Sequence, residues 1–221
     1  QLLLRAKRRG VRFARTATLG RQGLHASRPA LLALLGELGV AVPAPVERRL
    51  RDASQPFAEA FLELLGAESV TAVDASGYEG AQVVHDMNLP IPEELEGRFD
   101  LVLDGGTLEH VFDFPTGIRN AMRMVAPGGV LIVATITNNF SGHGFYQFSP
   151  ELFFRLLCRE NGYAVERCVL WEEVEGSPFW EVPDPDLLGR RIELTSRAGT
   201  FLWVEARRLA AVPPTHTPQQ S

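Results

Sequence analysis

Three of the apolar runs in this sequence end in an aspartate, at Asp74, Asp86 and Asp104, and the last is followed closely by Glu109 and His110. Carboxylates accept hydrogen bonds from the hydroxyl and amino groups of ligands. Glutamate and histidine side chains can also take up and release a proton. The pattern predicts a binding site built at the ends of strands.

The elements that position these residues alternate between strands and helices. Apolar or β-rich runs predict strands at residues 13–19, 69–74, 82–86, 98–104 and 130–135. Helices are predicted at residues 30–38, 56–66, 114–125 and 150–159. This alternation indicates an α/β fold with a Rossmann-like doubly wound sheet, mostly parallel. More strictly alternating runs predict an antiparallel edge pair at residues 163–171 and 200–209. Ligands of such sheets bind beyond the carboxyl ends of the strands.

The composition excludes several classes of function. The chain has 221 residues with 22 basic and 27 acidic side chains, and its net charge of −5 argues against a nucleic-acid binder. The first 28 residues nevertheless carry eight basic side chains and no acid. Apolar runs are about five residues long, whereas a membrane-spanning helix needs about 20, so we expect no membrane insertion and a cytoplasmic location. Cys158 and Cys168 indicate neither a disulfide scaffold nor a zinc site, and no metal ligands are expected.

The length predicts one domain with appendages. The main domain is expected to span residues 13–210, and it overlaps a basic N-terminal arm or helix at residues 1–28. The Pro-containing segment 39–56 is expected to be a lid insertion, and the acidic segment 172–199 a long loop. The tail at residues 211–221 is expected to be disordered.

Two stretches in a fixed order are similar to a known enzyme family. They are residues 99–110, FDLVLDGGTLEH, and residues 123–132, RMVAPGGVLI. Together they resemble the second half of a class I S-adenosylmethionine-dependent methyltransferase. The resemblance covers residues 60–171 and a final strand near residues 200–209.

The resemblance implies S-adenosylmethionine as the cofactor and assigns its contacts to the strand ends. A carboxylate after the second strand would accept hydrogen bonds from the ribose, as in dinucleotide sites. The implied contacts are Asp74 and Ala75 for the ribose, Asp86, Met87 and Asn88 for the adenine, and Asp104 and Gly105 for the methionine part.

The glycine-rich turn that this family has after its first strand is degenerate here. The candidate is the segment 19–23, in which Gly20 and Gly23 are the implied cofactor contacts. Glycines let the backbone approach a ligand because no Cβ intervenes. Arg21 brings a cation into this loop, where it would pair with the methionine carboxylate, fill the site itself or bind a substrate phosphate.

Methyl transfer to a hydroxyl group or a protonated amine needs a general base. The candidates are His143, His110 and Glu109, although His143 is equally compatible with packing in a turn. The loop around His143 is rich in aromatic residues and is expected to form the wall that binds the acceptor. The predicted acceptor contacts are Asn139, Phe140, Phe145 and Tyr146.

The sequence therefore predicts a methyltransferase acting on a small molecule such as a sugar, an amino acid derivative or a natural-product intermediate. One alternative is an enzyme of the same fold that catalyses a cyclisation, dehydration or isomerisation instead. Another is a non-catalytic subunit that binds a partner. Expected partners are the small-molecule substrate and either a second copy of the chain or a carrier protein, with no nucleic acid and no membrane.

Overall fold

The computed structural model describes residues 1–52, 54 and 56–220. Within them, one eight-stranded sheet has the order β3-β2-β1-β4-β5-β8-β6-β7. Its strands are β1 (Arg15–Leu19), β2 (Ser69–Asp74), β3 (Val83–Val84), β4 (Phe99–Asp104), β5 (Val125–Asn138), β6 (Tyr163–Glu172), β7 (Trp180–Glu181) and β8 (Thr200–Arg208). Strands β1 to β5 pair in parallel, and β8, β6 and β7 extend the sheet in antiparallel pairings. The predicted Rossmann-like sheet is confirmed.

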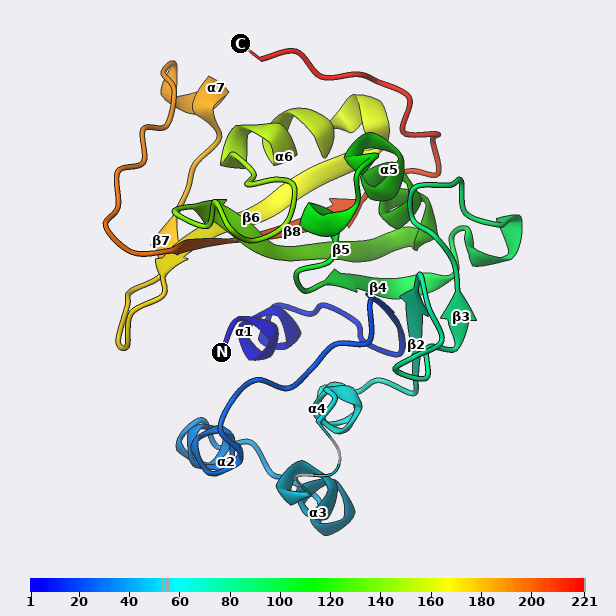
Figure 1. Ribbon diagram of the computed structural model, residues 1–221, viewed down its shortest axis with the longest axis vertical. Helices are drawn as coiled ribbons and strands as arrows, with labels where there is room; N and C mark the ends of the chain where they lie inside the picture. The colour runs from blue at the N-terminus through cyan, green and yellow to red at the C-terminus, as the bar shows by residue number, and fades with distance from the viewer. Residues whose placement is uncertain (53, 55, 221) are drawn as a thin grey trace.

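Helices cover both faces of this sheet (Figure 1). On one face lie α5 (Phe114–Met124) and α6 (Pro150–Leu156), and on the other lie α1 (Leu2–Arg8), α2 (Arg28–Glu37), α3 (Ala44–Arg51) and α4 (Glu59–Leu64). Alternate residues of β4 point to opposite faces of the sheet. Val102 packs in the core on the side of α5, and Leu101 and Leu103 pack in the core on the side of α4. Burial on both faces explains why β4 is apolar throughout its middle.

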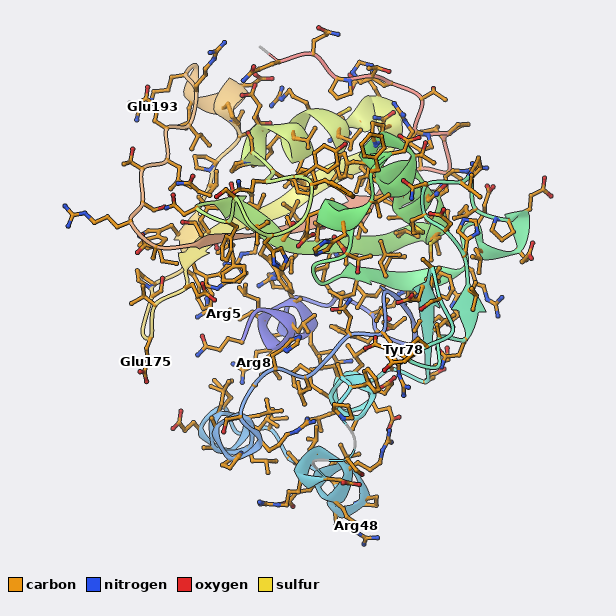
Figure 2. The ribbon with its side chains drawn as sticks, in the orientation of Figure 1. Arg5, Arg8, Arg48, Tyr78, Glu175 and Glu193 are labelled. Atoms are coloured by element: carbon orange, nitrogen blue, oxygen red, sulfur yellow. The ribbon has the colours of Figure 1, made fainter. Side chains whose placement is uncertain are left out.

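The basic N-terminal segment is part of the fold, and the alternative of a helix is confirmed by α1. Leu4 and Ala6 of α1 are buried in the core below the sheet. Arg9, just after α1, forms an ion pair with Glu205 of β8, whose side chain is 1% exposed. Arg5 also belongs to α1, and its guanidinium lies 5.1 Å from the centre of the Phe179 ring (Figure 2).

Within the segment 39–56, residues 44–51 form helix α3 in the layer below the sheet, and residues 53 and 55 lie outside the described part; the lid insertion stays a prediction. Helix α3 packs against α2 and α4, and Arg49 forms an ion pair with Glu63. Arg48 of the same helix points away from the rest of the molecule (Figure 2). Its apolar residue Leu50 is 1% exposed, which accounts for the helix docking here.

The two segments predicted to be irregular are more ordered than expected. Segment 172–199 contains β7 and the short helix α7 (Pro185–Leu188), which Arg155 of α6 holds through Asp184 and Asp186. Residues 211–220 have no helix or strand, but His216 and Asn161 exchange two hydrogen bonds. The described part of the tail is therefore attached to the domain, and Ser221 lies outside it. None of the described helices has the length and apolarity that a membrane span needs.

Candidate functional site

The carboxyl ends of β1, β2 and β4 meet at one edge of the sheet. Leu19 of β1 is in register with Asp104 of β4. Gly20 follows with a φ of 68°, and a Cβ on it would lie 2.9 Å from Thr107 Oγ1 and 3.8 Å from Asp74 Oδ2. A side chain there would be both strained and crowded. Gly20 therefore occupies the close-approach position that the glycine turn requires.

Arg21 is held by residues of two other segments, the start of α4 and the loop after β2. Its Nε donates a hydrogen bond to Glu59 Oε1 at 2.6 Å, and its Nη1 donates to the Glu79 carbonyl at 2.6 Å. Its guanidinium also stacks on Phe57 at 3.8 Å. Because Glu59 neutralises its charge, the expectation that Arg21 offers a free cation to the cofactor or a substrate phosphate is wrong.

Gln22 takes the place next to Gly105, and sequence reasoning missed it. Its amide donates to the Leu19 carbonyl, and a Cβ on Gly105 would fall 2.1 Å from Gln22 Oε1. Gly23 forms an isolated bridge with Phe57, which keeps the loop against the start of α4. The turn after β1 is thus closed by its own glutamine side chain.

Asp74 stands at the end of β2 as predicted. Its Oδ1 accepts a hydrogen bond from the Ser76 backbone at 2.8 Å, while its Oδ2 faces Gly20. The neighbouring Ala75 is exposed. One carboxylate oxygen shapes the turn, and the other is directed toward the expected cofactor position.

The residues after β3 form a turn. Asp86 Oδ1 accepts hydrogen bonds from the backbone and the side chain of Asn88, and these bonds lower the pKa of Asp86 below its usual value. Met87 is buried in the core under α5, and its carbonyl accepts a hydrogen bond from Asn120. The buried Met87 side chain is turned into the core, so an adenine contact of this residue stays a prediction that only its backbone can satisfy. The exposed Asp86 remains accessible.

Asp104 is enclosed completely at the end of β4. Its Oδ1 accepts from the backbone N–H of Thr107 at 2.9 Å and of Leu108 at 3.3 Å. Its Oδ2 is buried without a partner among the described residues. Burial, together with the nearby Glu109 carboxylate, raises the pKa of Asp104 to about 8. Asp104 therefore lies beneath the site, and Gly105, which the Gln22 side chain covers, is the next residue toward its surface.

The structure brings the three predicted proton-transfer residues together. Glu109 and His110 lie in the short 3-10 helix η2 (Leu108–His110), and His143 lies in the loop after β5. The His143 Nε2 is 3.8 Å from Glu109 Oε1, and the centres of the two imidazole rings are 4.9 Å apart. Both histidines are exposed, whereas the Glu109 side chain is 1% exposed. Thr135 of β5 donates a hydrogen bond at 2.9 Å to the other oxygen, Glu109 Oε2.

Backbone contacts press the His143 loop against Glu109. The Glu109 carbonyl accepts hydrogen bonds from the N–H of Phe145 at 2.8 Å and of Tyr146 at 3.3 Å. Gly144 has a φ of 71°, and a Cβ on it would lie 2.8 Å from the same carbonyl oxygen. The close approach requires glycine, and it places His143 beside Glu109.

An aromatic rim lies next to this cluster. Phe112 is 72% exposed and Phe145 is 66% exposed, and their ring centres are 5.8 Å apart. The Tyr146 hydroxyl donates a hydrogen bond to the Phe112 carbonyl at 2.7 Å. Sequence reasoning missed Phe112, although it comes two residues after the motif that ends at His110. Exposed rings beside polar groups are typical of a surface that binds an apolar ligand.

Asn139 and Phe140 have mainly structural contacts. The Asn139 side chain donates to the carbonyls of Ser196 and Ala198, and Asn139 itself has a φ of 61°. The Phe140 ring packs 4.9 Å from Phe201. The predicted role of Asn139 in acceptor binding is wrong, because its amide is used to hold the segment before β8.

Comparisons with known proteins agree with this architecture. The family model described as "Methyltransferase domain" matches residues 54–133. A "Ubiquinone biosynthesis O-methyltransferase" from Rhizobium etli is 29% identical over 154 residues, which cover 67% of this chain and 58% of that protein. A protein of the same name from Mesorhizobium japonicum is 30% identical over 111 residues, covering 48% and 45%. A solved structure from Bacillus halodurans that is assigned to the methyltransferases has a TM-score of 0.51 at 13% identity, covering 95% and 98%.

The fold and the strand-end site define an α/β protein with a Rossmann-like sheet that presents its ligand groups after β1, β2 and β4. The family match adds that residues 54–133 of this sheet and its helices are similar to the methyltransferase domain, and the solved structure shares the fold. The chain spans somewhat more than half the length of the curated relatives first matched.

The residues present fit the cofactor of this family, S-adenosylmethionine, with one exception. Asp74 offers a carboxylate oxygen for a ribose, and it lies beside the Cβ-free backbone of Gly20 at the end of β1. Gly105 is covered by Gln22, whose side chain has to rotate before a ligand can contact this glycine.

Proposed function

We propose that the protein transfers the methyl group of S-adenosylmethionine to a hydroxyl group of a small, partly apolar molecule. The observation that carries the proposal is the pairing of the buried Glu109 with the exposed His143 beside an exposed aromatic rim. The O-methyltransferase names of the curated relatives support a hydroxyl acceptor.

The reaction is a displacement at the methyl carbon. With S-adenosylmethionine bound, the acceptor oxygen would bond to the methyl carbon as the carbon–sulfur bond breaks with its electron pair on sulfur, and the Glu109–His143 pair would take up the acceptor proton. Glu109 Oε1 lies 3.8 Å from His143 Nε2, so the carboxylate stands beside the imidazole ring. The aromatic rim orients the acceptor, and alignment of the reacting atoms supplies much of the acceleration.

Calorimetry and thermal unfolding with S-adenosylmethionine test cofactor binding. A ligand at 100 times its dissociation constant adds about 2.7 kcal/mol of stability. Asp74→Ala is expected to weaken binding about tenfold through loss of a charge-assisted hydrogen bond, while Asp52→Ala, directly after helix α3, serves as the matched control. An unchanged affinity in Asp74→Ala would show that the ribose contact is assigned to the wrong residue.

The closed turn at Gln22 favours a second candidate, an enzyme of the same fold that does not methylate. If neither the natural protein nor Gln22→Gly binds millimolar S-adenosylmethionine, this second candidate replaces the first. Binding by Gln22→Gly alone would mean that Gln22 shuts an otherwise intact site.

A further inference from the structure

We propose that Glu109, His110 and His143 form a site for a divalent transition-metal ion that holds the acceptor oxygen. The inference deepens the proposed function and rests on it for the identity of the acceptor. It also replaces the expectation, drawn from the spacing of cysteines and histidines, that the chain has no metal ligands.

The geometry of the cluster suits such an ion. One ligand atom from each of Glu109, His110 and His143 can be chosen so that all three lie within 4.8 Å of one another. The residues come from two chain segments, η2 and the loop after β5, which the Glu109 carbonyl ties together through the Phe145 and Tyr146 N–H groups. A small shift of the two exposed imidazole rings would bring the three ligand atoms within bonding distance of a single ion.

The buried carboxylate needs a cation that the protein does not supply in full. Among the described residues Glu109 has no lysine or arginine partner, and its ion pair is with His143, which is charged only when protonated. Asp104 adds a second enclosed carboxyl group, and it too has an oxygen without a partner. A buried carboxylate without a compensating cation is costly. A bound divalent ion would remove this cost.

Thr135 prepares Glu109 for this role. Its hydroxyl holds Glu109 Oε2 at 2.9 Å, so Oε1 is the oxygen turned toward the histidines. Hydrogen bonds of this kind orient the carboxylates and imidazoles of metal sites. Two imidazoles and one carboxylate favour Mn²⁺, Fe²⁺, Co²⁺ or Zn²⁺ over Mg²⁺ and Ca²⁺, which prefer oxygen ligands.

Three protein ligands leave coordination positions open on the exposed side of the cluster. An acceptor hydroxyl bound there would lose its proton more easily, as bound water does. In this arrangement the O–H bond breaks and the proton passes to solvent water, the metal-held oxygen bonds to the methyl carbon, and the carbon–sulfur electron pair stays on sulfur. With an ion bound, the histidines act as ligands and the proton goes to solvent water; without an ion, the Glu109–His143 pair would take it up.

The test is a titration of the chelator-treated, tag-free chain with Co²⁺, followed by visible absorption, and with Mn²⁺, followed by electron paramagnetic resonance. We expect one saturable site. His110→Ala and His143→Ala should each weaken it at least tenfold, because the loss of a mere supporting residue already costs 10- to 100-fold. Both histidines are exposed, so these variants should fold. His85→Ala is the matched control, since the His85 ring contacts the Leu89 carbonyl away from the cluster.

Absence of saturable binding at millimolar Co²⁺ and Mn²⁺, or equal binding by the two histidine variants and the natural protein, would overturn the metal site. The result is separable from the proposed function because S-adenosylmethionine binding is measured by calorimetry with chelator present. Metal binding without cofactor binding would leave the site in place and refute the methyltransferase proposal. Cofactor binding together with methyl transfer that resists the chelator would support the methyltransferase proposal and refute the metal site.

Discussion

The two ends of strand β4 carry aspartates with opposite environments. Near the amino end, Asp100 receives hydrogen bonds from Arg15 and an ion pair from Arg12, and these contacts lower its pKa. At the carboxyl end, Asp104 has no arginine partner among the described residues, and burial beside Glu109 raises its pKa to about 8. At the amino end the carboxylate of Asp100 is paired with arginines of the protein. At the carboxyl end one oxygen of the Asp104 carboxyl group has no partner among the described residues.

Glu205 of β8, like Asp100, is a buried acid that is paired with an arginine. Its buried carboxylate is matched by Arg9 and by the indole N–H of Trp203. The basic N-terminal segment therefore serves to neutralise acids within the domain. Strongly perturbed carboxyl groups without a partner tend to mark functional sites. The difference teaches that the carboxyl end of β4 is built for a ligand and the amino end for stability.

The largest effect is expected at the functional end. His143→Ala should lower kcat for methyl transfer by about 100-fold or more, because the group that assists removal of the acceptor proton is lost. S-adenosylmethionine affinity should not change. Steady-state kinetics with His85→Ala as control would check this, and full activity of His143→Ala would return the residue to a role in the turn.

The next largest effect is expected on stability, at the buried ion pair of Arg9 with Glu205. Arg9→Ala should lower the free energy of unfolding by about 3 kcal/mol, since it leaves the Glu205 carboxylate buried without its cation. Arg12→Ala removes an ion pair whose arginine is 65% exposed and should cost less than about 1 kcal/mol. Urea unfolding of both variants measures the two free energies. Equal losses of unfolding free energy would contradict the expected difference between the buried and the exposed ion pair.

The pH dependence of stability follows from Asp104. Folding raises its pKa from about 4 to about 8, so between these values the folded state holds a proton that the unfolded state has lost. Stability should therefore fall as pH rises through this window, with a contribution of about 1.4 kcal/mol per pH unit. Denaturant unfolding at pH 5, 6 and 7 with a chelator present would measure it. Asp104→Asn should remove this component, and an unchanged pH profile in that variant would exclude Asp104 as its source.

The smallest effect concerns the turn after β1. Gln22→Gly should tighten S-adenosylmethionine binding by up to about tenfold, roughly one hydrogen bond's worth of free energy, because the side chain no longer has to leave Gly105. Calorimetry with Gln147→Gly as control measures the change. Weaker binding in Gln22→Gly would instead make Gln22 a ligand contact.

Periodicity and strand-end chemistry predicted most of the sheet. The strand ends Asp74 and Asp104 lie at the expected edge, because continuous apolar runs have few alternatives to a buried parallel strand. The short elements inside the segments 39–56 and 172–199, namely α3, β7 and α7, were not predicted. In both segments proline suggested a break, whereas Pro43 directly precedes α3 and Pro185 begins α7, positions at which proline is tolerated.

The sequence by itself determined the order of strands and helices, and it placed the acids and glycines after the strands, because these features depend on local patterns of apolar and polar residues. Only the tertiary structure decided that Arg21 pairs with Glu59, that Gln22 covers Gly105, and that His143 meets Glu109. The partners in each of these pairs lie tens of residues apart in the sequence. Their contacts depend on how loops fold over the sheet edge, which no local pattern specifies.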